Sequence, residues 1–298
     1  MATETVTTQD LLLRGLKIVY TDDEINRFRK ESTKSDTFIL HFGARPEALA
    51  AQWNDLVTTT IPEAVLNEGC KNPTKFLFAH FYMKEYPKDR RLKSIFHLYR
   101  AECREWIWYF IYKIAMLKEF KIMLPEYWKT AKDMALFTVD GVHFWTKEFS
   151  LADIPFDSKR YSQKNNHAGL AYEVALALSE SLIIWTSGPF KAGTGDITIY
   201  KKKGGLMEKV PESCLGIADN GYNARNIAKP NSLDDPDVKD FKSRARSRQE
   251  AINSRIKAYQ CFAQRFRHNE EKHELLFTAA CVTLNYDMKD GGRPLFDI

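Results

Sequence analysis

Cysteine and long apolar stretches are scarce in this sequence. It has only five cysteines in 298 residues, none in a CxxC pair or in a Cys/His cluster with the spacing of a zinc site. It also lacks a run of about 18 apolar residues and the cationic and apolar parts of a secretory leader. We therefore expect buried thiols in a reducing compartment, and a soluble intracellular protein with no membrane partner.

A strong excess of one charge is also missing. The net charge is only +5, so charge alone does not indicate a nucleic-acid-binding protein. The distribution of charge is more informative, because the segment from Lys239 to His268 contains nine Lys or Arg and only two acids. Hydrophobic residues make up 44% of the chain, enough for a sizeable core in one or two domains.

The chain changes character near Thr130. Residues 9–128 have mostly helical periodicity, and Pro125 precedes a change to strand-like alternation. We therefore predict a helical N-terminal region over residues 1–130 and an α/β domain over residues 131–298. Within the second region, residues 169–178 and 182–186 are expected to form a β-hairpin.

Three acids stand where strands or helices could bring them together. Asp140 and Asp219 each follow a short apolar run and precede a glycine by one or two residues, and Glu250 lies in a helix beginning near Asp237. Carboxylates are the ligands that Mg²⁺ and Mn²⁺ prefer, and a pair of such ions can catalyse phosphodiester cleavage. Since the chain has 39 Asp and Glu, these positions need the support of their surroundings.

The surrounding motifs supply that support, and they share an order and spacing from about Ala135 to the C-terminus. They are Thr138-Val-Asp-Gly-Val-His143, Tyr161-Ser-Gln-Lys164, Tyr172-Glu173, Trp185-Thr-Ser-Gly-Pro-Phe190, Gly195-Asp-Ile-Thr198, Ala218-Asp-Asn-Gly-Tyr222, Arg248-Gln-Glu250 with Asn253 and Lys257, and Gly292-Arg-Pro-Leu-Phe296. This set resembles the DDE endonuclease domain of PIF/Harbinger-type transposases.

The resemblance implies an RNase H-like mixed sheet flanked by helices. Asp140 would lie on the first strand, Asp219 after the fourth strand, and Glu250 on a late helix, each serving as catalytic residue and metal ligand. Two Mg²⁺ or Mn²⁺ ions would support cleavage of double-stranded DNA at terminal inverted repeats and joining to target DNA. The family also implies a nuclear homo-oligomer, sometimes with a Myb-like accessory protein.

The N-terminal region is similar to the helical region that precedes the endonuclease domain in the same family. A short helix over residues 89–96, a turn, and a helix from Ala101 to Ile114 predict a helix-turn-helix-like unit. Arg100, Arg104 and Lys113 are its candidate DNA contacts, although a solvated face would carry the same residues. His97 occupies the turn where a glycine is expected.

Further basic residues are expected to contact DNA phosphates from the endonuclease domain: Lys164, Arg246, Arg248 and Lys257. The alternative for the helix is an ordinary ion pair between Arg246 and Glu250, four residues apart. Gln249 differs from the family, which commonly has His before the Glu, but its replacement removes no metal ligand.

Three structural expectations concern the rest of the domain. Asp196 precedes Ile197 and is expected to be a helix N-cap in preference to a metal ligand. Residues 146–166 are expected to form a loop over the site. The helix over residues 271–287 is expected to pack against the sheet.

Two other functions remain open. One is a domesticated transposase that binds DNA or acts as a scaffold without cutting, and the other is a nuclease that cleaves without transposing. All three acids are present, which favours an active enzyme over the first of these.

Overall fold

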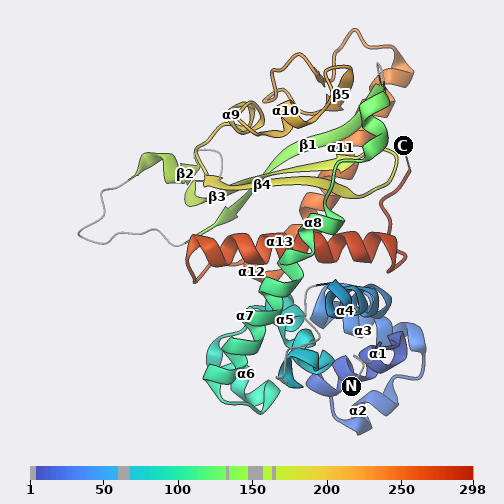
Figure 1. Cartoon of the computed structure of the whole chain (residues 1–298), viewed down its shortest axis with the longest axis vertical. Coiled ribbons are helices and arrows are strands. Elements are labelled where there is room, and N and C mark those ends of the chain that lie inside the picture. Colours follow the sequence, from blue (N-terminus) through green and yellow to red (C-terminus); the bar gives the residue numbers. More distant parts are fainter. Residues whose placement is uncertain (1–4, 60–67, 132–133, 147–156, 163–165, 298) are drawn as a thin grey trace. The chain divides into compact units, whose positions relative to one another are not determined.

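The computed structural model describes residues 5–59, 68–131, 134–146, 157–162 and 166–297. Its elements are drawn in Figure 1, and its internal contacts divide the chain into two compact units. The helical unit comprises residues 1–120, 258–261 and 275–294, and the sheet unit comprises residues 121–257, 262–274 and 295–298. The first segment of the helical unit thus ends at Phe120, whereas the sequence pattern changes near Thr130.

The regular elements described in the N-terminal part of the chain are all helices, as its periodicity predicts. Its elements are α1 (Thr8–Val19), α2 (Asp22–Arg27), α3 (Glu31–Phe42), α4 (Pro46–Thr59), η1 (Glu68–Lys71), α5 (Pro73–Glu85), α6 (Asp89–Phe96), α7 (Arg100–Met116) and α8 (Lys118–Lys121). Helix α5 illustrates why these bounds follow from sequence. The side chain of Asn72 accepts a bond from the Thr74 amide, and Pro73 stands in the first turn, where no amide hydrogen is needed.

Helices α6 and α7 are joined by the tight turn that the sequence predicts. His97 ends α6 in the left-handed conformation, at φ 55° and ψ 27°, and its amide donates to Lys93 O. Glycine adopts this conformation without a steric penalty, which explains why a glycine is expected there. Helix α7 packs inward through Cys103, Phe110 and Ile114, which are fully buried.

Among its described residues, the sheet unit contains six strands and several helices. The strands are β1 (Met134–Trp145), β2 (Tyr161–Ser162), β3 (His167–Ala177), β4 (Ile183–Lys191), β5 (Cys214–Ile217) and β6 (Ile227–Ala228). The other elements from residue 122 onward are η2 (Glu126–Thr130), η3 (Ser158–Arg160), α9 (Asp196–Tyr200), α10 (Leu206–Lys209), α11 (Pro236–Lys257), α12 (Gln260–Ala263) and α13 (Glu270–Lys289).

The strands form one mixed sheet in the order β2-β3-β1-β5-β6, with β4 also paired to β3. The pairs β1–β3 and β3–β4 are antiparallel, and the pairs β1–β5 and β5–β6 are parallel. An open mixed sheet flanked by helices confirms the predicted α/β class. The predicted hairpin is also confirmed as β3 and β4, joined through residues 178–182.

Helix α13 contributes to both units. In the sheet unit, His273 is fully buried, and its ring stacks on Tyr172, whose hydroxyl lies 2.8 Å from His273 Nδ1. Residues 275–294 group instead with the helical unit, where Tyr286 donates to Asp55 at 2.7 Å. The prediction that this helix packs against the sheet is confirmed at His273, which contacts Tyr172 of β3, whereas residues 275–294 group with the helical unit.

Candidate functional site

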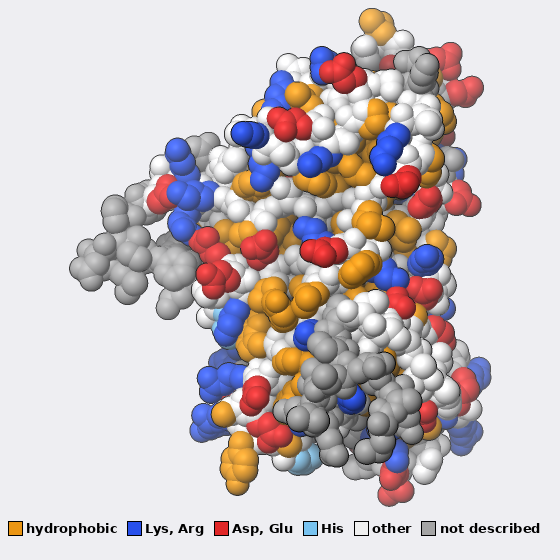
Figure 2. Space-filling model, viewed as in Figure 1, with side chains coloured by type: hydrophobic (Ala, Val, Ile, Leu, Met, Phe, Trp, Pro, Cys, Tyr) orange, Lys and Arg blue, Asp and Glu red, His pale blue; other side chains and the backbone are white. Residues whose placement is uncertain are grey.

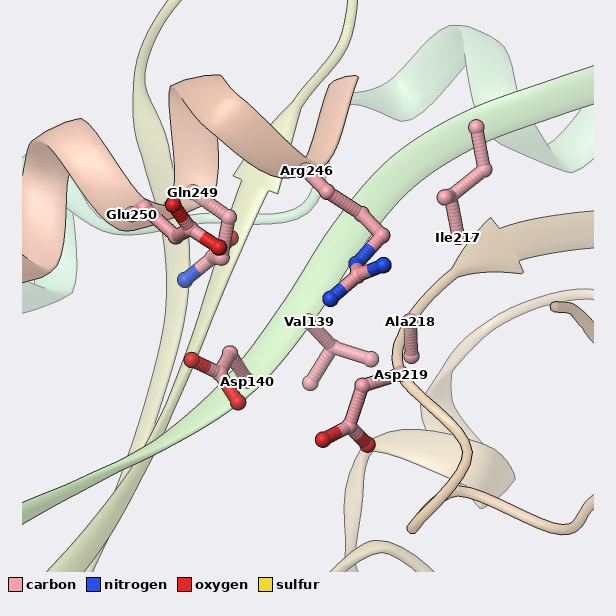
Figure 3. A pocket seen from close by; sticks show the side chains of 8 residues that line it. All are labelled: Val139, Asp140, Ile217, Ala218, Asp219, Arg246, Gln249 and Glu250. Carbon is pink, nitrogen blue, oxygen red and sulfur yellow. The ribbon is translucent and has the colours of Figure 1, made fainter. Parts of the chain in front are cut away.

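A pocket of about 180 Å³ brings the three predicted acids of the sheet unit together. It is lined by Val139, Asp140, Ile217, Ala218, Asp219, Arg246, Gln249 and Glu250. Figure 3 shows the three acids around the space into which the guanidinium of Arg246 extends. Residues from β1, from the end of β5 and from α11 thus form one polar site, as the sequence predicts.

Two of the acids lie where β1 and β5 separate. The parallel pairing of these strands ends at Thr138 and Ile217, while β1 continues and pairs Asp140 with Val174 of β3. Asp219 comes two residues after the end of β5, and its Oδ1 accepts the Gly221 amide at 2.8 Å. The end of the parallel pairing therefore opens the space that both carboxylates reach.

The third acid is placed by its neighbour in α11. Gln249 is buried, with its Oε1 accepting from Thr138 Oγ1 at 2.7 Å and its Nε2 donating to Val174 O at 3.2 Å. These bonds attach α11 to β1 and β3, and the adjacent Glu250 lines the pocket. Gln249 thus has a structural role that uses both the oxygen and the nitrogen of its side-chain amide.

A second side chain of α11 reaches β1. Asn253 exposes only 8% of its surface, and its Nδ2 donates to Asp140 Oδ2 at 2.8 Å. The sequence motif includes Asn253, but its contact with an acid from a distant strand was not predicted. Its spacing of three residues from Glu250 was the available indication, since such residues share a helix face.

Arg248 is not placed to contact DNA, which corrects a prediction. It exposes 3% of its surface, and its guanidinium donates to Leu178 O at 2.7 Å and to Ser181 Oγ at 2.6 Å. Both acceptors belong to the connection between β3 and β4. Arg248 therefore attaches α11 to this hairpin and is inaccessible to a phosphate.

Asp196 is not the N-cap of α9, which corrects a second prediction. Gly195 occupies the N-cap position, and no side chain makes a capping bond there. The Asp196 carboxylate instead lies over Gly141, with Oδ1 2.2 Å from the position that a Cβ on Gly141 would occupy. Its Oδ2 is 3.6 Å from the corresponding position on Gly221, and Asp219 Oδ1 is 3.0 Å from that same position. Asp196 is therefore a fourth acid beside the site.

Two buried groups lie within the field of these acids. Burial, followed by the negative charges of four carboxylates, raises the pKa of the Tyr222 hydroxyl; these carboxylates are Glu173, Asp196, Asp140 and Asp219. Burial also raises the pKa of Glu173 to about 7, although its bond from Trp185 Nε1 at 3.1 Å opposes the rise and the Asp196 charge adds to it. Carboxylates from β1, β3, α9 and the segment after β5 thus act on the same buried hydroxyl.

The remaining predicted DNA contacts lie outside this pocket. Arg100 is exposed at the first position of α7, and Arg104 is exposed and pairs with Asp89 at 3.2 Å. Lys257 is exposed at the end of α11, and Lys164, like much of the predicted loop over residues 146–166, lies outside the described residues. On the face drawn in Figure 2, basic and acidic side chains are interspersed, in keeping with the modest net charge.

The donor chemistry of the pocket suits a hard divalent cation. Its acids offer carboxylate oxygens only, and a bound cation would relieve the repulsion among them. As their side chains stand, however, the residues that the structure describes include no group of three His, Cys, Asp or Glu placed to hold a metal ion.

Comparison with protein-family models, with curated proteins and with solved structures finds no match. Within the described part of the chain, no helix is both long and apolar enough to cross a membrane. The five cysteines are buried, as the sequence predicts, and form no disulfide: Cys70, Cys103, Cys214, Cys261 and Cys281.

Proposed function

We propose that this chain is a metal-dependent DNA endonuclease and transposase of the PIF/Harbinger type, with an RNase H-like catalytic domain. The observation that carries the proposal is the convergence of Asp140, Asp219 and Glu250 on one pocket. The topology supports it, because β1 carries the first acid, the second follows β5, and the third lies on the late helix α11. Strand β5 is the fourth strand of more than two residues, since β2 has only two.

In this proposal, Asp140, Asp219 and Glu250 hold two Mg²⁺ or Mn²⁺ ions. When bound, such ions lower the pKa of water or of a 3′-hydroxyl and stabilise charge on the reacting phosphate. Arg246 extends into the same pocket and is suited to bind a phosphate oxygen of the DNA strand. Because α11 is attached to the sheet through Gln249, the chain holds these groups on a fixed frame.

DNA binding would involve a second surface in the helical unit. Helix α7 begins after a tight turn and presents the exposed side chains of Arg100 and Arg104. We propose that α6 and α7 act as a helix-turn-helix, with α7 in the major groove. A nuclear location, assembly into a homo-oligomer and a Myb-like partner belong to the same proposal and rest on the resemblance alone.

The test is cleavage of double-stranded DNA that carries the element's own terminal inverted repeats, in Mg²⁺ or Mn²⁺. We expect Asp140→Asn, Asp219→Asn and Glu250→Gln each to abolish cutting while leaving the thermal midpoint of unfolding nearly unchanged. The controls are Asp240→Asn, on the exposed side of α11, and Glu180→Gln, in the exposed turn between β3 and β4. Both controls should cut like the wild type.

Two outcomes would change the proposal. Specific binding of the repeats without cutting, in either metal, would favour the domesticated DNA-binding protein. Metal-dependent cutting that is insensitive to all three acid substitutions would contradict the assignment of this pocket as the active site.

A further inference from the structure

Asn253 connects the helix that carries Glu250 to the strand that carries Asp140. Its buried amide donates to Asp140 Oδ2 at 2.8 Å, across two elements that are far apart in sequence. We propose that Asn253 is a positioning residue that fixes the Asp140 carboxylate for metal binding. This inference rests on the proposed function of the pocket.

The chemistry of an amide suits this role. A Lys or Arg in the same place would neutralise Asp140 and compete with a metal ion for it, whereas an amide donates a hydrogen bond without bringing a charge. A carboxylate has about four acceptor positions on its two oxygens, and the bond from Asn253 occupies one of them. Asn253 can therefore orient Asp140 and leave its charge available.

The surrounding contacts make α11 a firm support for this bond. One turn before Asn253, Gln249 binds Thr138 on β1 at 2.7 Å and Val174 on β3 at 3.2 Å. Glu250 lies between Gln249 and Asn253 along the helix. The same short segment thus places one acid of the pocket directly and orients another through a hydrogen bond, so the separation of the two carboxylates depends on it.

The experiment measures Mn²⁺ binding directly, without DNA, by calorimetry and by the loss of the free-ion electron paramagnetic resonance signal. Asn253→Leu keeps the approximate shape of the side chain and removes the donor. We expect it to weaken Mn²⁺ binding by about ten- to a hundredfold, the usual effect of losing a partner of a metal ligand. Cleavage should require a correspondingly higher Mn²⁺ concentration for half its maximal rate.

The matched control is Asn226→Leu, which replaces another buried asparagine of the sheet unit. It should bind Mn²⁺ like the wild type, even if it is less stable. Asn253→Ala is the second test variant, and it should show the same weakening if Asn253→Leu does not fold. Thermal unfolding of every variant without metal identifies losses caused by general damage.

The outcomes separate this inference from the proposed function. If the wild type binds Mn²⁺ and the folded Asn253 variants bind it equally well, the positioning role is wrong while the metal site stands. Equal weakening by Asn226→Leu and the Asn253 variants would also overturn it, because the effect would then be nonspecific. If the wild type neither binds Mn²⁺ nor cuts DNA, both the proposed function and this inference are wrong.

Discussion

The carboxylate of Asp196 occupies the space beside Gly141 that any larger residue would fill. Its Oδ1 lies 2.2 Å from the position of a Cβ on Gly141, and its Cγ lies 3.1 Å from it. The neighbouring Asp140 contacts α11, and successive residues of a strand point to opposite faces. The missing side chain of Gly141 thus lets an acid from α9 approach β1 from the face opposite to α11.

Substitution of Gly141 tests this close approach. Gly141→Ala should displace the Asp196 side chain and lower the free energy of unfolding by about 1–3 kcal/mol, the usual cost of an overpacked site. Combining it with Asp196→Ala should recover much of this loss, because the displaced carboxylate is then absent. Chemical denaturation of the single and double variants measures the coupling.

The control for that experiment is Gly195→Ala, next to Asp196 in sequence. A Cβ at Gly195 would meet only Thr198 Oγ1, at an ordinary distance of 3.8 Å. It should change stability by less than about 0.5 kcal/mol. Additive effects of Gly141→Ala and Asp196→Ala would contradict the steric relationship.

Arg248 is expected to matter for stability. Arg248→Met removes two hydrogen bonds from a buried guanidinium and leaves Leu178 O and Ser181 Oγ without this donor. We expect a loss of about 2–3 kcal/mol in the free energy of unfolding, since hydrogen bonds from charged donors are strong. A loss below about 0.5 kcal/mol, measured in urea, would contradict the buried role.

Arg246, in contrast to Arg248, is expected to affect DNA affinity and to have little effect on stability. Arg246→Met removes a cation that extends into the pocket, so it should leave the free energy of unfolding within about 0.5 kcal/mol of the wild type. If this cation contacts a phosphate, DNA affinity should fall for all sequences, and the slope of log affinity against log salt should decrease by about 1. Fluorescence anisotropy over a salt series measures this, with Arg248→Met as the partner variant.

The raised pKa of the buried Glu173 carboxyl predicts that stability depends on pH. Burial raises its pKa from the ordinary 4.5 to about 7 in the folded protein, so the fold binds this proton more tightly than the unfolded chain does. Its contribution to stability is therefore present below pH 4.5 and is lost as the pH rises toward 7. Glu173→Gln should remove this loss and gain about 3 kcal/mol at pH 8, since each pH unit between the two pKa values corresponds to about 1.4 kcal/mol.

Denaturation in chelator at pH 5 and pH 8 checks the prediction. The exposed Glu180→Gln is the control, and it should leave the wild-type pH dependence unchanged. Equal stability of wild type and Glu173→Gln at pH 8 would mean that the buried carboxyl ionises without cost.

The left-handed backbone conformation of His97 predicts that glycine at this position would stabilise the helical unit. The residue has a φ of 55°, a conformation that is strained for most residues and relaxed for glycine. His97→Gly should raise the free energy of unfolding by about 0.5–1 kcal/mol, after allowance for the extra freedom of glycine in the unfolded chain. His97→Ala is the matched control, because it removes the imidazole and keeps the strained Cβ, and it should give no gain.

The sequence predicted elements best where local chemistry decides them. Asn72 and Pro73 mark the start of α5, and the polar residues 179–181 between two apolar runs mark the hairpin of β3 and β4. The three acids of the pocket were also predicted, because each stands beside a glycine or within a motif that limits its position. Such features act within a few residues, so they can be read along the chain.

Contacts across elements were predicted poorly. Asp196 precedes an apolar helix, and this pattern is the same whether the acid caps the helix or reaches across to Gly141. Arg248 was missed although helical spacing places it beside Ala245 and Ile252, which are both fully buried. Charge suggested a surface residue, but its position on the helix already indicated burial.

The pairing pattern of the sheet has a consequence for how the chain folds. Strand β1 pairs antiparallel with β3, and β3 pairs antiparallel with β4, which follows it directly in the chain. The pairing of β1 with β5, in contrast, spans the whole hairpin together with α9 and α10. Closing a long loop is slow, so we expect the antiparallel strands to form before β5 joins them. During synthesis, the pocket is incomplete until the chain beyond Glu250 has emerged from the ribosome. Any chemistry of the pocket therefore belongs to the finished protein and to none of its earlier intermediates.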